Sequence, residues 1–206
     1  NPEKRAEAYV KGEVKDAEDA LKGARDIIAE QVSEDEQARN TVRFAFSRQA
    51  VITAKVVKGK ETEADKYRDY FEFSKPLKKC TSHQLLAIRR AEAEGLLKVS
   101  ISPDDEECVE RLERRFVRSN NPCGEQVAEA VQDAYKRLLK SSIETEFAAQ
   151  SKEQADEEAI RVFVQNLRQL LLASPLGQKR VMGIDPGFRT GCKVICLDAQ
   201  GNLLHN

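Results

Sequence analysis

The sequence predicts a mainly α-helical protein, with a multi-helix body that carries a few short strands and is followed by the first β-strands of another domain. Up to about residue 177, apolar residues recur at helical spacing between residues that favour helix caps. After Gly177 the composition changes to short, strand-like apolar runs. The 206 residues are 40% hydrophobic and 33% charged and include no Trp. This mix is typical of a helix-rich chain of one or two domains.

The first 57 residues predict two helices and a segment of undecided structure. An apolar stripe predicts a helix over residues 14–32, and its members are Ala17, Leu21, Ala24, Ile27 and Ile28. Ser33-x-x-Glu36 has the spacing of a capping box and predicts a second helix toward Ala50. Residues 51–57 are β-branched and fit either a strand or a helix, because β-propensity depends on context.

The middle of the chain carries three further helix signals and one strand. Ser82 predicts the cap of a helix over residues 83–93, which Gly95 ends. Residues 96–101 largely alternate apolar and polar side chains, as a short strand does. Ser102-Pro103 predicts a helix through Val117. Asn121-Pro122 has the same pattern and precedes a predicted long helix from about Glu125 to Leu139.

The last helix and the strands after it complete the pattern. Ser151-x-x-Gln154 predicts a helix start, and Pro175 and Gly177 predict its end. Its apolar residues have the spacing of one buried stripe: Ile160, Phe163, Val164, Leu167, Leu170 and Leu171. Residues 181–184 and 192–197 have the pattern of strands, and residues 198–201 have the composition of a turn.

Charge, apolar run length and cysteine content argue against three classes: a chain whose overall charge attracts nucleic acid or membranes, a membrane-spanning protein and a disulfide-bonded protein. The net charge is −1, so attraction to nucleic acid or a membrane requires a local patch. Apolar runs such as residues 170–173 are far shorter than the roughly 18 residues that span a bilayer. Five cysteines without CxxC spacing indicate reduced thiols in a cytosolic protein. Cys192 and Cys196 on one strand would lie roughly 13 Å apart, too far for a disulfide.

An acidic residue between glycines stands out in the last part of the chain. Asp185 ends a short apolar strand, and Gly183 and Gly187 flank it. A carboxylate that backbone can approach closely suits a metal ion or a phosphate. Metal-dependent hydrolysis needs several converging carboxylates, and the one other acidic residue between Asp185 and Asn206, Asp198, falls in the predicted turn.

Several segments together carry a resemblance to a known family. They are residues 56–60 (VVKGK), 67–71 (YRDYF), 82–90 (SHQLLAIRR), 133–139 (DAYKRLL), 155–160 (ADEEAI) and 183–191 (GIDPGFRTG). In this order they resemble the middle of the Tex family of bacterial transcription accessory proteins. In that family, helical regions surround a YqgF-type domain with an RNase H-like fold. Helix-hairpin-helix modules and a C-terminal OB-fold RNA-binding domain follow it.

The resemblance implies a domain organisation. Residues 1–177 are expected to form a Tex-type helical region, and residues 178–206 the N-terminal β-hairpin of a truncated YqgF/RNase H-like domain. The chain is then expected to begin after the family's helix-turn-helix region and to end inside the YqgF-type domain. A hairpin without sheet neighbours is marginally stable. Its apolar face is therefore expected to dock on the helical body, to pair with another chain or to remain disordered.

The resemblance also assigns a role to Asp185. This residue matches the first carboxylate of RNase H-like nucleases and Holliday-junction resolvases, where it binds a divalent metal. For the fragment we expect no cofactor and no catalysis, because one carboxylate does not make a metal site. In an intact parent, two interpretations stay open: a metal ligand, or a relic in a nucleic-acid-binding fold.

Basic clusters are the candidates for contact with nucleic acid. The predicted contact residues are Lys58, Lys60, Arg89, Arg90 and Arg189, and further clusters lie at residues 75–79 and 111–118. Acidic residues beside many of them favour the alternative of solvated helix faces with weak ion pairs. The aromatic residues at 67, 70, 71 and 73 fit either a stacking platform or, in the preferred interpretation, anchors in the core.

These observations lead to three functional hypotheses. The first is a fragment of a cytoplasmic transcription accessory factor that scaffolds RNA- or DNA-binding domains, with weak or no nucleic-acid contact of its own. The second is a partial RNase H-like metal-dependent nuclease domain, inactive as a fragment. The third is a helical module that contacts the transcription machinery. None of them involves a membrane.

Overall fold

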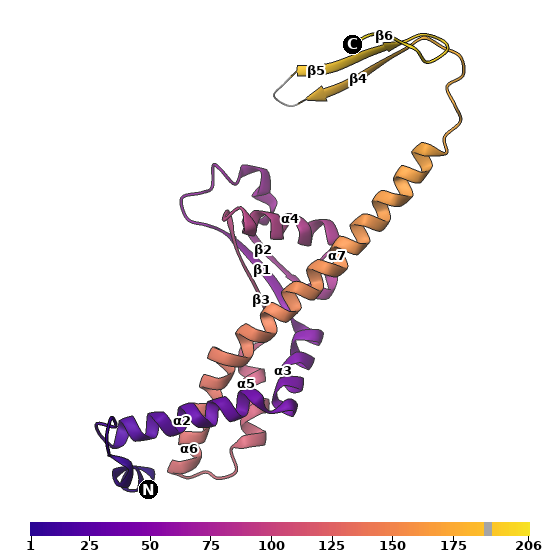
Figure 1. The fold of residues 1–206 in the computed structure, drawn as a ribbon. Helices are drawn as coiled ribbons and strands as arrows, with labels where there is room; N and C mark the ends of the chain where they lie inside the picture. Colours follow the sequence, from indigo (N-terminus) through magenta and orange to yellow (C-terminus); the bar gives the residue numbers. More distant parts are fainter. Residues whose placement is uncertain (188–190) are drawn as a thin grey trace. The chain divides into compact units, whose positions relative to one another are not determined.

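The computed structural model describes residues 1–187 and 191–206 and shows a mainly helical chain with two small antiparallel sheets (Figure 1). It divides into two units, Asn1–Ile160 and Arg161–Asn206, each considered by itself. The α-helices are α1 (Pro2–Ala6), α2 (Ala17–Glu34), α3 (Glu36–Gln49), α4 (Ser82–Ala93), α5 (Asp105–Phe116), α6 (Pro122–Asp133) and α7 (Lys140–Leu171). The shorter helical turns are η1 (Glu7–Tyr9), η2 (Asp65–Tyr70), η3 (Leu77–Lys79) and the π-helical η4 (Ala134–Leu139). The strands are β1 (Val51–Val56), β2 (Glu72–Pro76), β3 (Leu97–Ser102), β4 (Val181–Gly187), β5 (Gly191–Leu197) and β6 (Leu203–His205).

The junction between α2 and α3 differs from the predicted capping box. Ser33 lies inside the last turn of α2, where its hydroxyl donates to the Glu30 carbonyl at 2.9 Å. Asp35 has extended backbone angles and caps α3, because its carboxylate accepts from the Ala38 amide at 2.7 Å. A carboxylate caps a helix as well as a hydroxyl does. The predicted cap was therefore two residues early.

Two other predicted caps were displaced and one is confirmed. Thr81, not Ser82, caps α4 and shares a capping box with Gln84. Asp104, not Ser102, caps α5 by accepting from the amides of residues 106 and 107. Asn121 caps α6 as predicted, with its side-chain oxygen 3.0 Å from the amides of residues 123 and 124. In each displaced case, another capping residue lies within two positions.

Residues 51–102, called here the sheet lobe, contain the first sheet, with strand order β2-β1-β3 (Figure 1). Residues 51–57, undecided from sequence, lie mostly in β1, which pairs antiparallel with both neighbours. Ile52 and Ala54 are fully buried, and the alternating Lys55 is exposed. Helix α4 packs against β3 and buries Leu85 and Ile88. The sheet thus has one covered face and one polar, open face.

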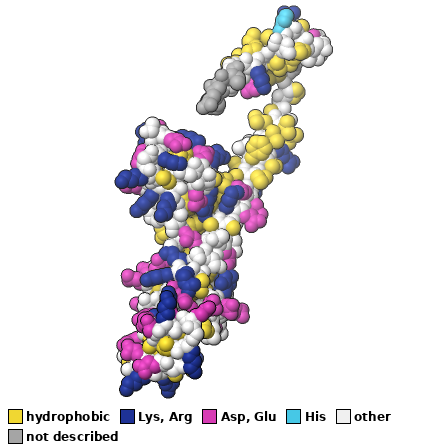
Figure 2. Space-filling view, turned by 60° about the vertical axis from the view of Figure 1, so that its left-hand side comes forward, with side chains coloured by type: hydrophobic (Ala, Val, Ile, Leu, Met, Phe, Trp, Pro, Cys, Tyr) yellow, Lys and Arg dark blue, Asp and Glu magenta, His cyan; other side chains and the backbone are white. Residues whose placement is uncertain are grey.

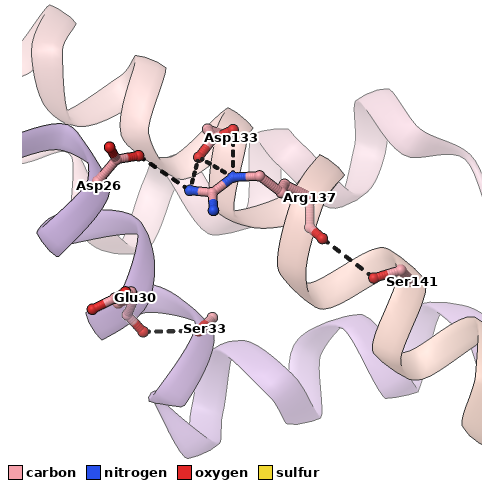
Figure 3. A network of polar contacts seen from close by, with 6 residues as sticks. All are labelled: Asp26, Glu30, Ser33, Asp133, Arg137 and Ser141. Atoms are coloured by element: carbon pink, nitrogen blue, oxygen red, sulfur yellow. Dashed lines mark hydrogen bonds and ion pairs between the residues drawn. The ribbon is translucent and has the colours of Figure 1, made fainter. Parts of the chain in front are cut away.

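The remaining core of the first unit lies where α2, α6 and η4 meet. Tyr135, Leu139 and Ile143 are fully buried and form part of one continuous apolar cluster. At the edge of this core, Arg137 of η4 pairs with Asp133 at 2.6 Å and with Asp26 of α2 at 3.2 Å (Figure 3). The guanidinium thereby ties the two helices together at the surface.

Two predicted apolar stripes are placed differently from the expectation. In α2, Ile27 is 59% exposed, whereas Ala29 and Val32 are buried. In α7, the stripe from Ile160 to Leu171 is exposed, including Leu171 at 75%. Helical spacing identifies a face, but only the tertiary partners decide whether that face is covered.

Helix α7 has no start near Ser151. The predicted capping signal lies in the helix interior, where the Ser151 hydroxyl donates to the Ala148 carbonyl at 3.2 Å. Ser and Thr side chains form such bonds to the preceding turn within helices. The helix is therefore continuous from Lys140 to Leu171.

The second unit carries the predicted strands and turn. Strands β4, β5 and β6 form a consecutive antiparallel sheet. Asp198 organises the turn between β5 and β6, since its carboxylate accepts from the amides of Gln200 and Asn202 at 2.9 and 2.8 Å. Met182 and Ile184 on β4 are exposed. The five cysteines are free thiols, and no helix in the described ranges is long and apolar enough to cross a membrane.

Candidate nucleic-acid interface

Positive charge concentrates in the sheet lobe. Residues 51–102 contain 11 Lys and Arg against seven Asp and Glu, a formal net charge of +4, whereas the whole chain carries −1. Within the lobe, residues 73–91 contain five Lys and Arg and no acidic residue. We call residues 73–91 the basic segment. Figure 2 shows several Lys and Arg side chains on the visible face of this lobe, with acidic side chains among them.

A helical turn presents two lysines of the basic segment. Turn η3 follows β2 directly, and the Leu77 amide donates to the Ala50 carbonyl at 2.8 Å. The side chain of Leu77 packs against the core, while Lys78 and Lys79 are exposed. The ion pairs that lysines form within the described residues involve positions 66, 140 and 152. Lys78 and Lys79 are therefore available to an external anion.

Lys75 belongs to the same region but is partly engaged. Its ammonium group donates to Gln84 Oε1 at 3.1 Å, and the same oxygen accepts from the Thr81 amide at 3.4 Å. This contact ties the end of β2 to the start of α4 within the basic segment.

The predicted pair Lys58 and Lys60 lies elsewhere on the lobe, in the turn after β1. The ammonium group of Lys60 stands over Gly95, 3.6 Å from the point that a Cβ atom on this glycine would occupy. Glu61 folds back so that its carboxylate accepts from the Gly59 amide at 3.2 Å. An acidic side chain therefore lies in the same turn as this pair and reduces its local potential.

The predicted arginines have different environments. Arg89 is only 14% exposed and donates from Nη1 to Glu92 at 2.6 Å. Its Nε and Nη2 atoms are buried without a partner among the described residues. Arg90 is exposed on α4, so it is the better placed of the two to meet a phosphate. Arg189 lies outside the described residues.

The aromatic residues of the lobe serve as core anchors. Tyr67 is 7% exposed, and its hydroxyl donates to Glu94 at 3.1 Å. The rings of Tyr70 and Phe73 meet edge to face at 5.6 Å, and Phe71 also packs against the core. Edge-to-face pairs stabilise packed aromatic clusters. These four residues therefore do not present an open stacking platform.

Asp185 lies in β4, exposed and in register with Lys193 of β5. Across residues 1–187 and 191–206, no group of three or more His, Cys, Asp or Glu side chains has the spacing of a metal site. The described residues therefore place Asp185 in β4 without forming a three-ligand metal site around it.

A cavity that the sequence did not predict adjoins the basic segment. It has a volume of about 460 Å³ and lies among α3, η3, the start of α4 and one face of α7. Its floor includes Phe46 and Phe147, whose ring centroids are 5.4 Å apart. Polar side chains of α7 that line it are Gln150, Ser151, Gln154 and Glu158. The helical spacing of these side chains could be read from the sequence. Only the fold shows that this face of α7 lies against the sheet lobe and lines a cavity.

The chain resembles known proteins along almost its whole length. Residues 1–163 match the model of the Tex central region, and residues 179–206 match the model of the Tex protein YqgF-like domain. The uncharacterized protein YdcI of Bacillus subtilis is 38% identical over 93% of this chain. The transcriptional accessory protein Tex of Neisseria gonorrhoeae is 37% identical over 97% of it. The human S1 RNA-binding domain-containing protein 1 is 28% identical over 96%.

The match covers a minor part of these relatives. The chain spans 27% of the length of both bacterial proteins and 22% of the human one. The order of the matched regions agrees with the architecture, since a helical body is followed by the short strands of a YqgF-like start. This chain belongs to the Tex family of transcriptional accessory proteins.

Proposed function

We propose that this chain is part of a cytoplasmic transcription accessory factor, in which it scaffolds nucleic-acid-binding domains and itself touches nucleic acid through the basic segment. One relative is named a transcriptional accessory protein and another an S1 RNA-binding domain-containing protein. Under this proposal the chain acts by binding, with no catalysis of its own.

The observation that carries the direct contact is the basic segment, whose own residues 73–91 include no acidic side chain, although Glu158 of α7 reaches Ser82 at its edge. Phosphate contacts dominate the affinity of proteins for nucleic acid and require several cations on one surface. Lys78, Lys79 and Arg90 are exposed on the segment, and Lys75 stands beside them. Because the whole chain carries −1, this contact is weak and local, and it supplements stronger binding by other domains of the parent protein.

Salt-dependent binding of a single-stranded RNA and a duplex DNA, measured by fluorescence anisotropy at about 50 and about 200 mM salt, tests the proposal. Two matched double variants locate the contact: Lys78→Ala with Lys79→Ala, and Lys58→Ala with Lys60→Ala. Loss of two phosphate contacts lowers the slope of log K against log salt by about 1.4 for a single strand. We expect this loss for the first pair and little change for the second.

Two results would contradict the proposal. A larger loss for the variant at Lys58 and Lys60 would assign the contact to the turn after β1. An absence of salt-sensitive binding by the wild-type chain would remove direct nucleic-acid contact from its role. It would favour instead a helical module that contacts the transcription machinery.

A second candidate function rests on Asp185, which lies inside β4 rather than at the predicted strand end, because pairing with β5 continues to Gly187, within a YqgF-like match. In this alternative Asp185 is the first metal ligand of an RNase H-like nuclease site in the intact parent, which needs further carboxylates to hold one or two divalent ions. A divalent-metal titration of the complete domain, wild type against Asp185→Ala, tests it. Equal metal affinity and equal nuclease behaviour in the two proteins would rule out the ligand role.

A further inference from the structure

We propose that the cavity beside the basic segment is a pocket for one unstacked nucleotide of a single strand, and that it favours adenine and cytosine over uracil. This inference rests on the proposed function, because the basic segment holds the phosphates of the same strand. Its volume of about 460 Å³ falls within the range of about 300–1,000 Å³ that is typical of small-ligand sites.

The floor of the cavity suits the flat face of a base. Phe46 is buried and Phe147 is partly buried, and their rings meet at an interplanar angle of 38°. Leu77 and Leu85 add aliphatic surface from η3 and α4. Bases stack on aromatic side chains irrespective of sequence, since every base has a π-face. Phe147 is the ring that stays accessible for such a contact.

The wall formed by α7 supplies hydrogen-bonding groups. Gln150 and Gln154 are one turn apart on the same face and line the cavity. Within the described part of the chain, neither amide side chain forms a hydrogen bond, whereas the neighbouring Ser151 hydroxyl bonds to its own helix. A primary amide both donates and accepts, and it pairs with the edge of adenine in a bidentate manner. Both amides are thus available to read a base edge.

Glu158 gives the pocket its preference among bases. It lies one turn beyond Gln154 on the cavity wall and accepts a hydrogen bond from the Ser82 hydroxyl. An ionised carboxylate only accepts hydrogen bonds. It therefore attracts the exocyclic amino group of cytosine or adenine and repels the carbonyl that uracil presents at the corresponding position.

Lys78 connects the pocket to the basic segment, because it belongs to both. A nucleotide whose base enters the cavity has its phosphate near this ammonium group. The next phosphates along the strand then lie over the exposed surface of the segment. A duplex keeps its bases stacked, so only a single strand, or a base flipped out at an energetic cost, can use the pocket.

Cys80 provides a direct probe of occupancy. Its thiol lines the cavity and is partly buried, whereas Cys123 is exposed and lines a different hollow beside α1 and α2. The test is the rate of iodoacetamide alkylation at each cysteine, followed by mass spectrometry, with oligo(A), oligo(C) or oligo(U) of equal length. Oligo(A) and oligo(C) are expected to slow the alkylation of Cys80 at least about fivefold more than oligo(U) does. The rate at Cys123 stays unchanged.

Two variants separate the pocket from the surface contact. Glu158→Gln removes the obligate acceptor and is expected to bring the three oligonucleotides to within about twofold of each other in protecting Cys80. Glu157→Gln, one residue away on α7 and not on the cavity wall, is the matched control with the same change in charge. It is expected to retain the wild-type preference.

The outcomes distinguish failure of the pocket from failure of the proposed function. Oligonucleotides that bind in a salt-sensitive manner without slowing alkylation of Cys80 would overturn the pocket and leave the basic segment in place. Equal protection of Cys80 by all three would overturn the base preference. If none of them binds even at low salt, the proposed nucleic-acid contact fails as well.

Discussion

The Tyr135 hydroxyl donates to Asp105 Oδ1 at 2.7 Å, and this bond joins the π-helical turn η4 to the first turn of α5. The Ser102 hydroxyl donates to the same Oδ1 at 3.0 Å, and the other carboxylate oxygen, Oδ2, accepts from Lys140 Nζ at 2.6 Å. Burial raises the pKa of Tyr135 far above its ordinary value, and the bond to Asp105 raises it further. Tyr135 is therefore expected to remain a hydrogen-bond donor above the pH at which an exposed tyrosine ionises.

Tyr135→Phe is expected to lower the free energy of unfolding by about 1–2 kcal/mol, because it removes one hydrogen bond to a charged group and leaves the packing intact. Urea unfolding followed by circular dichroism measures the change. Tyr9→Phe is the control, since Tyr9 is 72% exposed, and it is expected to change stability by less than about 0.5 kcal/mol. Equal effects of the two substitutions would contradict a structural role for the Tyr135 bond.

Stability is expected to fall in acid through Asp105 and Asp35. Burial raises the pKa of Asp105, but hydrogen bonds from Lys140, Tyr135 and Ser102 outweigh it and bring the pKa below its usual range. The Ala38 amide and then Arg115 lower the pKa of Asp35. A folded pKa below the unfolded value of about 3.9 means that the stabilisation is present above that pH and is lost as the pH falls through the folded pKa.

The urea midpoint between pH 7 and about 2 measures this loss. Asp105→Asn is expected to make the urea midpoint depend less on pH in acid, because the amide cannot titrate. It is also expected to lower stability near neutral pH, because the ion pair with Lys140 is lost. A variant that keeps the full acid dependence of the wild type would show that other carboxylates cause it.

Asp35→Ala is expected to destabilise the first unit by about 1 kcal/mol, because α3 loses its N-cap. Asp35→Asn keeps a capping oxygen and loses only the ion pair with Arg115, which is 3.0 Å away, so its effect should be smaller. Ser33→Ala tests the position predicted from the capping-box spacing and should change stability little. A larger loss at Ser33 than at Asp35 would contradict the assignment of the cap.

Two glycine-to-alanine substitutions are expected to change the stability of the protein in opposite directions. At Gly124, on α6, a Cβ atom would lie 1.9 Å from the backbone oxygen of Ser119, so Gly124→Ala should cost at least about 1 kcal/mol through overpacking. Gly23 lies inside α2 with open space around it. Gly23→Ala should therefore stabilise by about 0.5–1 kcal/mol. Thermal unfolding of both variants checks the signs, and the same sign for both would contradict this account.

The helix boundaries show which local signals were sufficient. Asn121 was identified as a cap because Asn-Pro both caps a helix and starts it with a fixed backbone angle. At Ser33, Ser82 and Ser102 the predicted cap was displaced, since a second candidate stood nearby. Which of two neighbours adopts the extended backbone of a cap depends on the angle at which the next helix packs. That angle is a tertiary property.

The candidate site likewise has features that the local sequence predicted and features that it did not. The local sequence identified residues 75–79 as a basic cluster and Asp185 as a candidate ligand, because charged residues and flanking glycines can be read directly from the sequence. It did not show that Arg89 is mostly buried or that Glu61 folds back beside Lys60. The cavity was also beyond prediction, since its walls come from α3, η3, α4 and α7, up to about a hundred residues apart.

Periodicity, caps and ordered motifs are local properties of the chain, so they were enough to predict the mainly helical class, most of the elements and the family. Three features became clear only from the fold: residues 51–56 form a strand, the apolar face of α7 from Ile160 to Leu171 is exposed, and Gln154 and Glu158 line the cavity beside the basic segment. Strand pairing and the burial of a helix face depend on which residues from distant parts of the chain pack against them. The sequence of one segment does not specify which other segments pack against it.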